Sequence, residues 1–333
     1  MDIEKRHLRA GAAALACVLL LQLGKSGALK AIGEVLTGPK ALAAILFLET
    51  GRVLPPIVPQ QTQPPQQMQQ QESVSANIPE KDPEPMIFTS EDAQLVEVNS
   101  VCGYDADLPT LLQDPLTWKL RQDVPTVLIL HTHGTESYKN TEGYQESSSY
   151  RTVDTGYNVV SVGEHIKKLL EAGGIQVVHD KTLYDHPTYS SSYSRARSAI
   201  KKHLQENPSI ALVLDIHRDS VENGQGQQVE ITTQAADKKI AKLMMVVGTD
   251  ANGLDHPQWR KNMALAVKLH ALLEKEVAGI CRPISFRPQR FNQDLSAGGM
   301  LIEVGTAGNT RQQALDAATI LAETILQLAD GAG

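Results

Sequence analysis

Apolar and polar positions alternate with two different periods from residue 95 to the end of the chain. Four short apolar runs have the length and composition of buried strands, at 126–130, 175–178, 210–214 and 300–302. Four longer stretches repeat apolar residues at helical spacing, at 158–172, 193–205, 258–276 and 310–329. Further short strands are expected at 95–98, 228–232 and 243–247. This alternation predicts a three-layer α/β domain around a mixed, mostly parallel central sheet.

The N-terminal region, residues 1–51, differs from the rest of the chain. Lys5, Arg6 and Arg9 precede an uncharged, leucine-rich stretch at 10–24. A basic start and a short apolar core are typical of a signal peptide. We expect this region to be a membrane anchor. A cleaved signal peptide is the alternative, because the stretch is shorter than the roughly 20 residues that usually span a bilayer. Since the basic residues come first, the rest of the chain is predicted to be exported.

Residues 52–85 form a proline- and glutamine-rich stretch without the apolar residues of a core. This composition predicts an extended linker that holds a globular domain, residues 86–330, away from a membrane. The chain has 333 residues and a net charge of -7, which argues against a nucleic-acid-binding surface. Its three cysteines form no CxxC pair, so a cysteine-based zinc site is not expected.

Metal-binding side chains directly follow three of the predicted strands. His131 and His133 follow the first run, His217 follows the third and Glu303 follows the fourth. In open α/β sheets, ligands bind outside the carboxyl ends of the strands, so these side chains are expected at one edge of the sheet. Imidazole and carboxylate ligands suit zinc. The sequence therefore predicts a metallohydrolase site.

The ligand set leaves two alternatives open. A catalytic zinc ion takes three protein ligands and keeps one position for water. His217 and His133 are candidate ligands, and His131 competes with His133 because the two lie in one short segment. The third ligand is expected to be a carboxylate or another histidine, and both Glu136 and Asp154 are candidates.

Other residues are candidates for roles around the metal. Glu303 is the candidate general base, which would take the proton of the attacking water. Arg218 is a candidate to hold a substrate carboxylate, since a guanidinium binds carboxylates through two parallel hydrogen bonds. Asn292 and Asp294 precede the last predicted strand and are expected to line the cleft.

Over residues 86–330 the chain resembles the stage II sporulation protein P family. The matching stretches are 127–138, 158–163, 214–220, 246–249, 292–296 and 301–305. The family looks related to zinc-dependent N-acetylmuramoyl-L-alanine amidases, whose two histidine ligands and catalytic glutamate match His133, His217 and Glu303. The glutamate ligand of those enzymes has no clean match here, so Asp154 and Glu136 both stay candidates.

The resemblance implies an amidase-type, phosphorylase/hydrolase-like fold and a Zn²⁺ cofactor. It implies hydrolysis of the peptidoglycan amide that joins N-acetylmuramic acid to the L-alanine of the stem peptide, and an endopeptidase activity on peptide cross-links. It also implies a partner, the glycan-cleaving sporulation protein SpoIID, and action on the cell-wall side of the membrane at the sporulation septum. The alternative is a noncatalytic wall-binding scaffold that recruits other hydrolases.

Overall fold

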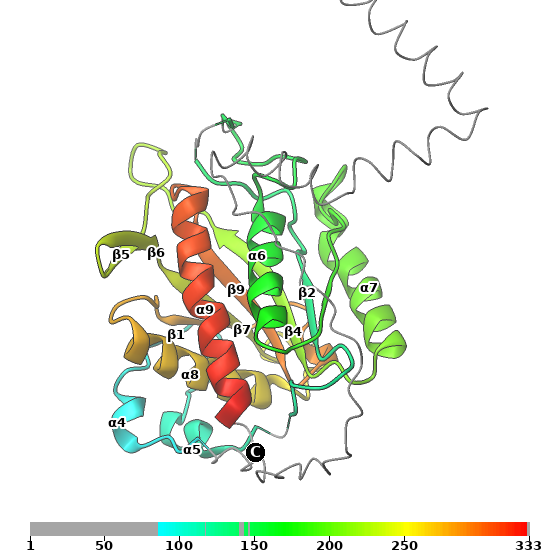
Figure 1. The fold of residues 1–333 in the computed structure, drawn as a ribbon, viewed down its shortest axis with the longest axis vertical. Helices are drawn as coiled ribbons and strands as arrows, with labels where there is room; N and C mark the ends of the chain where they lie inside the picture. The colour runs from blue at the N-terminus through cyan, green and yellow to red at the C-terminus, as the bar shows by residue number, and fades with distance from the viewer. Residues whose placement is uncertain (1–85, 117, 140–142, 146, 332–333) are drawn as a thin grey trace, which may run out of the picture. The chain divides into compact units, whose positions relative to one another are not determined.

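A seven-stranded sheet forms the centre of the structure, with the strand order β1-β8-β7-β9-β4-β2-β3 (Figure 1). The computed structural model describes residues 86–116, 118–139, 143–145 and 147–331, which lie within one compact unit, Ile78–Gly333. The sheet consists of β1 (Val98–Ser100), β2 (Val127–Leu130), β3 (Val177–His179), β4 (Leu212–Asp219), β7 (Leu243–Gly248), β8 (Ile284–Arg287) and β9 (Gly299–Thr306). All neighbours run parallel except β7 and β9, so the predicted mixed, mostly parallel sheet is confirmed.

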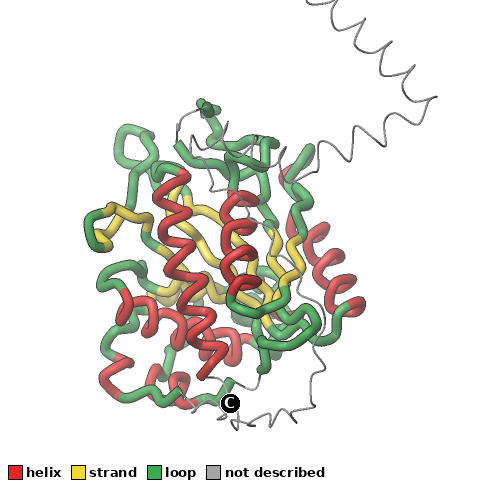
Figure 2. The backbone as a smooth tube through the Cα atoms, viewed as in Figure 1, coloured by secondary structure: helices red, strands yellow, loops and turns green. Residues whose placement is uncertain are grey.

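Helices cover both faces of this sheet and complete the three predicted layers (Figures 1 and 2). The long helices are α6 (Val159–Ala172), α7 (Ser192–Glu206), α8 (Trp259–Glu276) and α9 (Arg311–Gly331). The shorter elements are α4 (Ser90–Ala93), α5 (Leu108–Gln113), η1 (Tyr189–Ser191), η2 (Gln293–Leu295) and the separate hairpin of β5 (Thr232–Ala235) and β6 (Lys238–Ala241).

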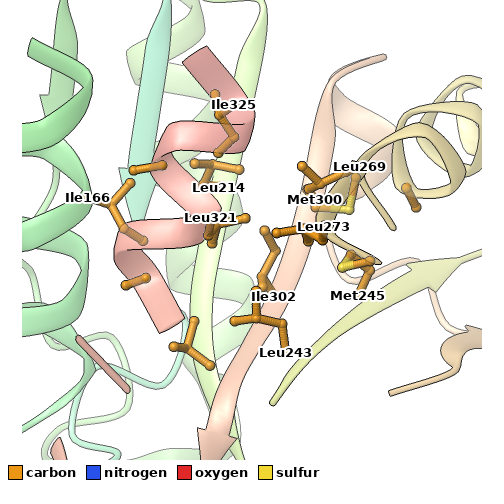
Figure 3. Packing of buried hydrophobic residues seen from close by; sticks show 14 of the residues in the cluster. Ile166, Leu214, Leu243, Met245, Leu269, Leu273, Met300, Ile302, Leu321 and Ile325 are labelled. Carbon is orange, nitrogen blue, oxygen red and sulfur yellow. The ribbon is translucent and has the colours of Figure 1, made fainter. Parts of the chain in front are cut away.

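Successive side chains of β4 and β9 point to opposite faces of the sheet, as the strand geometry requires. Leu214 of β4 and Ile302 of β9 are buried in the main apolar core. Figure 3 shows the side chains around them, which come from α6 (Ile166), α9 (Leu321, Ile325) and α8 (Leu269, Leu273). Ile216 of β4 and Val304 of β9 belong to the same core. Residues next to these core positions, among them His217 and Glu303, therefore lie on the other face.

That other face is covered unevenly. Apolar residues of α7 pack on β2 and β4 in a second cluster, which includes Ala196, Ile200, Leu128, Leu130 and Val213. Over β9, β7, β8 and β1 the same face borders a cavity, which is lined by Leu301, Val246, Ser285 and Asn99. The sheet itself thus forms the floor of a cleft on this side.

The four predicted helices are confirmed to within two residues at each end. Two strands are longer than predicted, because β4 continues to Asp219 and β9 to Thr306. The polar residues that marked their ends in the sequence are paired inside the sheet. The expected strand at 228–232 is wrong, since β5 begins only at Thr232, and β8 was not predicted.

The predicted anchor or signal region at 1–51 and the predicted linker at 52–85 both lie outside the described residues. Among the helices of the described part, none combines the length and the apolar character needed to cross a membrane.

Candidate active site

His217 and Glu303 lie inside two neighbouring strands, directly opposite each other. His217 of β4 is in register with Glu303 of β9, and both side chains line the cavity on the open face. Neighbouring strands are about 4.8 Å apart, so the pairing brings an imidazole and a carboxylate together. A β-bulge between His217 and Asp219 interrupts the pairing just beyond them. The prediction that the strands end before these residues is therefore wrong, although the prediction that they meet is confirmed.

The loop after β2 brings His133 and Glu136 to the same cavity. The Glu136 N–H donates to the His133 carbonyl oxygen at 3.0 Å and closes a tight turn. The Arg218 guanidinium of β4 fastens the loop, because it donates to the carbonyl oxygens of Ser137 at 2.9 Å and Tyr150 at 2.7 Å. Arg218 is only 6% exposed. The structure thus places Arg218, a predicted substrate ligand, beside the cavity with part of its guanidinium already engaged by the loop.

A carboxylate lies at each ring nitrogen of His217. Nδ1 is 3.4 Å from Glu136 Oε2, and Nε2 is 2.9 Å from Asp215 Oδ1, off the line of a hydrogen bond. Burial would lower the pKa of His217, but the two carboxylates outweigh it and raise the pKa well above its usual value. Burial would raise the pKa of Glu136, but His217 and Arg218 lower it to about 2. Asp215 is fixed by the N–H and hydroxyl of Thr132, at 2.8 and 2.6 Å.

The environment of Glu303 has the opposite effect on its carboxylate from that of Glu136, because it raises the pKa. Its Oε2 atom is buried and has no hydrogen-bond partner among the described residues. Burial raises the pKa of Glu303 to about 8, although the charge of His217 acts in the other direction. When two neighbouring carboxylates have pKa values pushed apart, one suits the role of a permanent anion and the other that of a proton carrier. Glu136 fits the first role and Glu303 the second.

His133 is held in a stack of three side chains. Its ring lies 4.4 Å from the Tyr189 ring, and the Arg151 guanidinium lies 4.8 Å from the centre of that tyrosine ring. The Tyr189 hydroxyl is also hydrogen-bonded to His133 Nε2 at 3.1 Å. The Nδ1 atom of His133 is buried and has no partner among the described residues. The stack fixes the imidazole beside His217, whose ring centre is 5.3 Å away.

His131 belongs to a different cluster, away from the cavity. Its Nδ1 donates to the Ile216 carbonyl oxygen at 2.9 Å, and its Nε2 is hydrogen-bonded to His179 Nε2 at 2.9 Å. His179 Nδ1 in turn lies 3.2 Å from Glu164. Gly163 makes room for the buried His131 ring, because a Cβ atom there would come within 2.6 Å of it. Both nitrogens of His131 are therefore engaged inside the fold.

Three other predicted residues also lie outside this cavity. Asp154 is exposed and accepts a hydrogen bond within its own turn. Asp294 holds Arg197 of α7 through two hydrogen bonds of 2.8 and 2.6 Å. Asn292 donates to the Tyr193 carbonyl oxygen at 2.9 Å. Asn292 and Asp294 thus fasten the segment before β9 to α7.

The cavity has a volume of about 680 Å³, and several residues that line it were not predicted from the sequence. They are Tyr189, Tyr193, Phe291, Arg282 and Arg287. The two tyrosines are four residues apart near the start of α7, a spacing that places side chains on one side of a helix and was available as a signal. Arg282 precedes β8 and Arg287 is its last residue. Because β8 was not predicted, nothing in the sequence placed the two arginines near Glu303.

The donor atoms at one end of the cavity fit zinc in their chemistry. His133 Nδ1, His217 Nδ1 and Glu136 Oε2 supply two imidazoles and one carboxylate. Two ligands about 2.1 Å from a tetrahedral ion are about 3.4 Å apart, and His217 Nδ1 and Glu136 Oε2 are separated by 3.4 Å. Within the described ranges, no group of three or more such side chains is already gathered around a metal position. The donor types, this distance and the His133 Nδ1 atom, which no described residue hydrogen-bonds, support the fit.

Comparisons with solved structures find N-acetylmuramoyl-L-alanine amidases. AmiC2 of Nostoc punctiforme is 16% identical with a TM-score of 0.37, and the match covers 61% of this chain and 96% of that one. The amidase of Clostridium difficile 630 is 17% identical with a TM-score of 0.37, covering 64% of this chain and 100% of that one.

Comparisons of sequence find a sporulation family. Stage II sporulation protein P of Bacillus subtilis (strain 168) is 28% identical over 218 residues, which are 62% of this chain and 51% of that protein. The match thus spans about half the length of this curated relative. The profile of the family described as Stage II sporulation protein P matches residues 49–326, which is well over half of the chain. The chain belongs to the stage II sporulation protein P family.

Proposed function

We propose that this chain is a zinc-dependent peptidoglycan hydrolase, which cleaves the amide bond between N-acetylmuramic acid and the L-alanine of the stem peptide. Membership in a sporulation family supports a role in remodelling the cell wall during sporulation. The cavity runs across the exposed face of several strands, and this shape suits a segment of a polymer.

The observation that carries the proposal is the placement of Glu303. Its Oε2 atom is buried, has no hydrogen-bond partner among the residues that the structure describes, and lies directly across from His217 on the next strand. Burying a carboxylate without a hydrogen-bond partner costs stability. Such a group is expected where catalysis requires it, because a general base must keep an atom free for the proton that it takes.

The residues then divide into two roles. His133, Glu136 and His217 would hold zinc, which when bound would supply an acidified water and polarise the substrate carbonyl. Glu303 Oε2 accepts a proton from the attacking water and delivers it to the amine nitrogen that leaves. The Asp215 carboxylate lies 2.9 Å from the His217 nitrogen that faces away from Glu136, the position from which carboxylates commonly orient zinc-bound histidines.

The hydrogen bonds and exposure of the candidate ligands favour one residue in each pair that the sequence left open. His133 is preferred to His131, because His131 uses both nitrogens inside the fold. Glu136 is preferred to Asp154, because Glu136 lies beside His217 whereas Asp154 is exposed.

The remaining parts of the proposal come from the family alone. They are an endopeptidase activity on peptide cross-links, cooperation with a SpoIID-like glycan-cleaving enzyme, and attachment to the membrane through residues 1–51 with the catalytic domain on the cell-wall side. Hydrolysis of cross-links needs no second site, because both reactions are amide hydrolyses.

The test compares the purified full chain with its Glu303→Gln variant. We expect about one equivalent of zinc in both, release of stem peptides from purified sacculi by the wild type, and loss of that release in the variant. Zinc is measured by elemental analysis and the fragments by mass spectrometry. Glu323→Gln, which changes an exposed carboxylate on α9, is the matched control and should behave as the wild type. A wild-type chain that binds sacculi with neither zinc nor hydrolysis would instead support the scaffold function.

A further inference from the structure

Arg287 differs from the other three arginines that line the cavity. Arg151 is paired with Asp185 at 2.7 Å, and Arg282 is paired with Asp219 at 2.6 Å. Arg218 is occupied by two backbone carbonyl oxygens.

The Arg287 side chain makes one hydrogen bond in the described part of the chain, from its Nε to the Ser285 hydroxyl at 2.7 Å. Ser285 is buried, so this bond ties the base of the guanidinium to the floor of the cleft. No carboxylate among the described residues lies within ion-pair distance of Arg287. Its two terminal nitrogens, which no described residue engages, can form the paired hydrogen bonds that guanidinium groups make with carboxylates.

The strand register gives the distance between Arg287 and the catalytic end of the cleft. Glu303 pairs with Met244 on β7, and Gly248 of the same strand pairs with Arg287 on β8. Two strand spacings of about 4.8 Å and four residues of about 3.3 Å put the Cα atoms of Glu303 and Arg287 about 16 Å apart. An arginine side chain spans about 6 Å of this separation, and an extended peptide covers the rest in about three residues.

The floor between these two ends suits an extended peptide. Leu301 of β9, Val246 of β7 and Ser285 of β8 lie on the same face and line the cavity between Glu303 and Arg287. The apolar side chains offer contact to aliphatic groups, and Arg287 offers a positive charge at the far end.

We propose that Arg287 forms a carboxylate-binding subsite, which takes a free carboxylate of the stem peptide about three residues from the amide that is cleaved. This inference rests on the proposed function, because it assumes that the scissile amide lies beside Glu303. It makes Arg287 a determinant of substrate specificity, with no part in the bond-breaking step.

The test uses two soluble muropeptides that differ at one group, a carboxylate or its carboxamide on the third residue of the stem peptide. The wild-type full chain is expected to prefer the carboxylate in kcat/KM by about tenfold, as for one charge-assisted pair in a solvated cleft. Arg287→Gln should lose the preference. Arg287→Lys should keep only part of it, because lysine retains the positive charge but cannot form two parallel hydrogen bonds to a carboxylate. Arg260→Gln, which changes an exposed arginine of α8, should keep the full preference.

Two results separate the failure of this subsite from the failure of the proposed function. If the wild type cleaves both muropeptides at the same rate, the subsite is wrong and the hydrolase proposal stands. If it cleaves neither, calorimetry still decides the question, because the free-carboxylate peptide should bind the wild type about tenfold more tightly than Arg287→Gln. Equal dissociation constants for the two proteins would overturn the inference.

Discussion

Two histidine clusters flank the carboxyl end of β2, and they use the same residue types in opposite ways. The inner cluster, His131, His179 and Glu164, is connected by hydrogen bonds, and both nitrogens of His131 have partners. The cavity cluster includes His133 and Glu303, each with a buried atom that has no described partner. Only one residue separates the two histidines of the loop after β2, so sequence position does not distinguish an imidazole that is hydrogen-bonded inside the fold from one that lines the cavity. The difference lies in whether the polar atoms are already satisfied.

The largest effect is expected from Glu303→Gln. Hydrolysis should fall by about 10²–10⁴-fold, the usual contribution of a general base. The melting temperature should stay the same or rise, because the change removes a buried carboxylate oxygen that has no hydrogen-bond partner in the described part of the chain. Activity on sacculi and thermal unfolding, measured on the same preparation, check both parts. A large loss of stability in this variant would mean that Glu303 is a structural residue like those of the inner cluster.

His131→Ala is expected to affect stability instead. It leaves a cavity and removes the partner of the Ile216 carbonyl oxygen, which together should lower the free energy of unfolding by about 2–4 kcal/mol. Zinc content and activity per folded molecule should be retained. His133→Ala is the matched variant and should show the reverse, with zinc binding lost and a smaller change in denaturant unfolding. Loss of zinc in His131→Ala would exchange the roles of the two histidines.

Tyr189→Phe is expected to lower the affinity for zinc without destabilising the fold. The change removes the hydroxyl that is hydrogen-bonded to His133 Nε2 and keeps the ring that stacks on it. Loss of such a partner of a metal ligand typically costs about 10–100-fold in metal affinity or activity. Zinc titration with a competing chelator measures it, and because Tyr189 is 55% exposed, thermal unfolding should change little. Unchanged zinc affinity would show that the stack does not position His133.

The smallest effect is expected at Asp180, which follows His179 of the inner cluster in the chain. It is a dependence of the stability of the fold on pH. Burial would raise the pKa of Asp180, but hydrogen bonds from Tyr184, Thr182 and His203 outweigh it and lower the pKa from 3.8 to about 2. The ionised carboxylate thus stabilises the fold above about pH 4, and this contribution, at most about 2 kcal/mol, is lost as the pH falls through about 2. In Asp180→Asn, the melting temperature should depend less on pH between pH 4 and 2. If it falls with pH as steeply as in the wild type, the assignment is wrong.

Much of the fold followed from the sequence, because apolar periodicity reports directly which side of an element is buried. All four long helices were predicted closely for this reason. Periodicity failed where a strand carries polar residues on its open face, as at His217 and Glu303, and where a strand is short and partly polar, as β8 is.

The candidate site was predicted in part. His133, His217 and Glu303 were expected to meet at the sheet, and they line one cavity. The preference for Glu136 over Asp154 was not predictable, because both residues lie in one long loop whose path is fixed by Arg218 from another strand. The role proposed for Arg287 depends in the same way on a strand pairing that only the folded sheet reveals.

The sequence by itself determined the α/β pattern, the three strands that carry the imidazole and carboxylate groups, and the membership of the family. Only the tertiary structure decided which of these groups are satisfied by hydrogen bonds and which face the cavity with free atoms. The physical reason is that side-chain direction follows from local backbone geometry, whereas burial and hydrogen-bond partners come from segments far apart in the chain. His131 illustrates this, since its partners are Ile216 and His179.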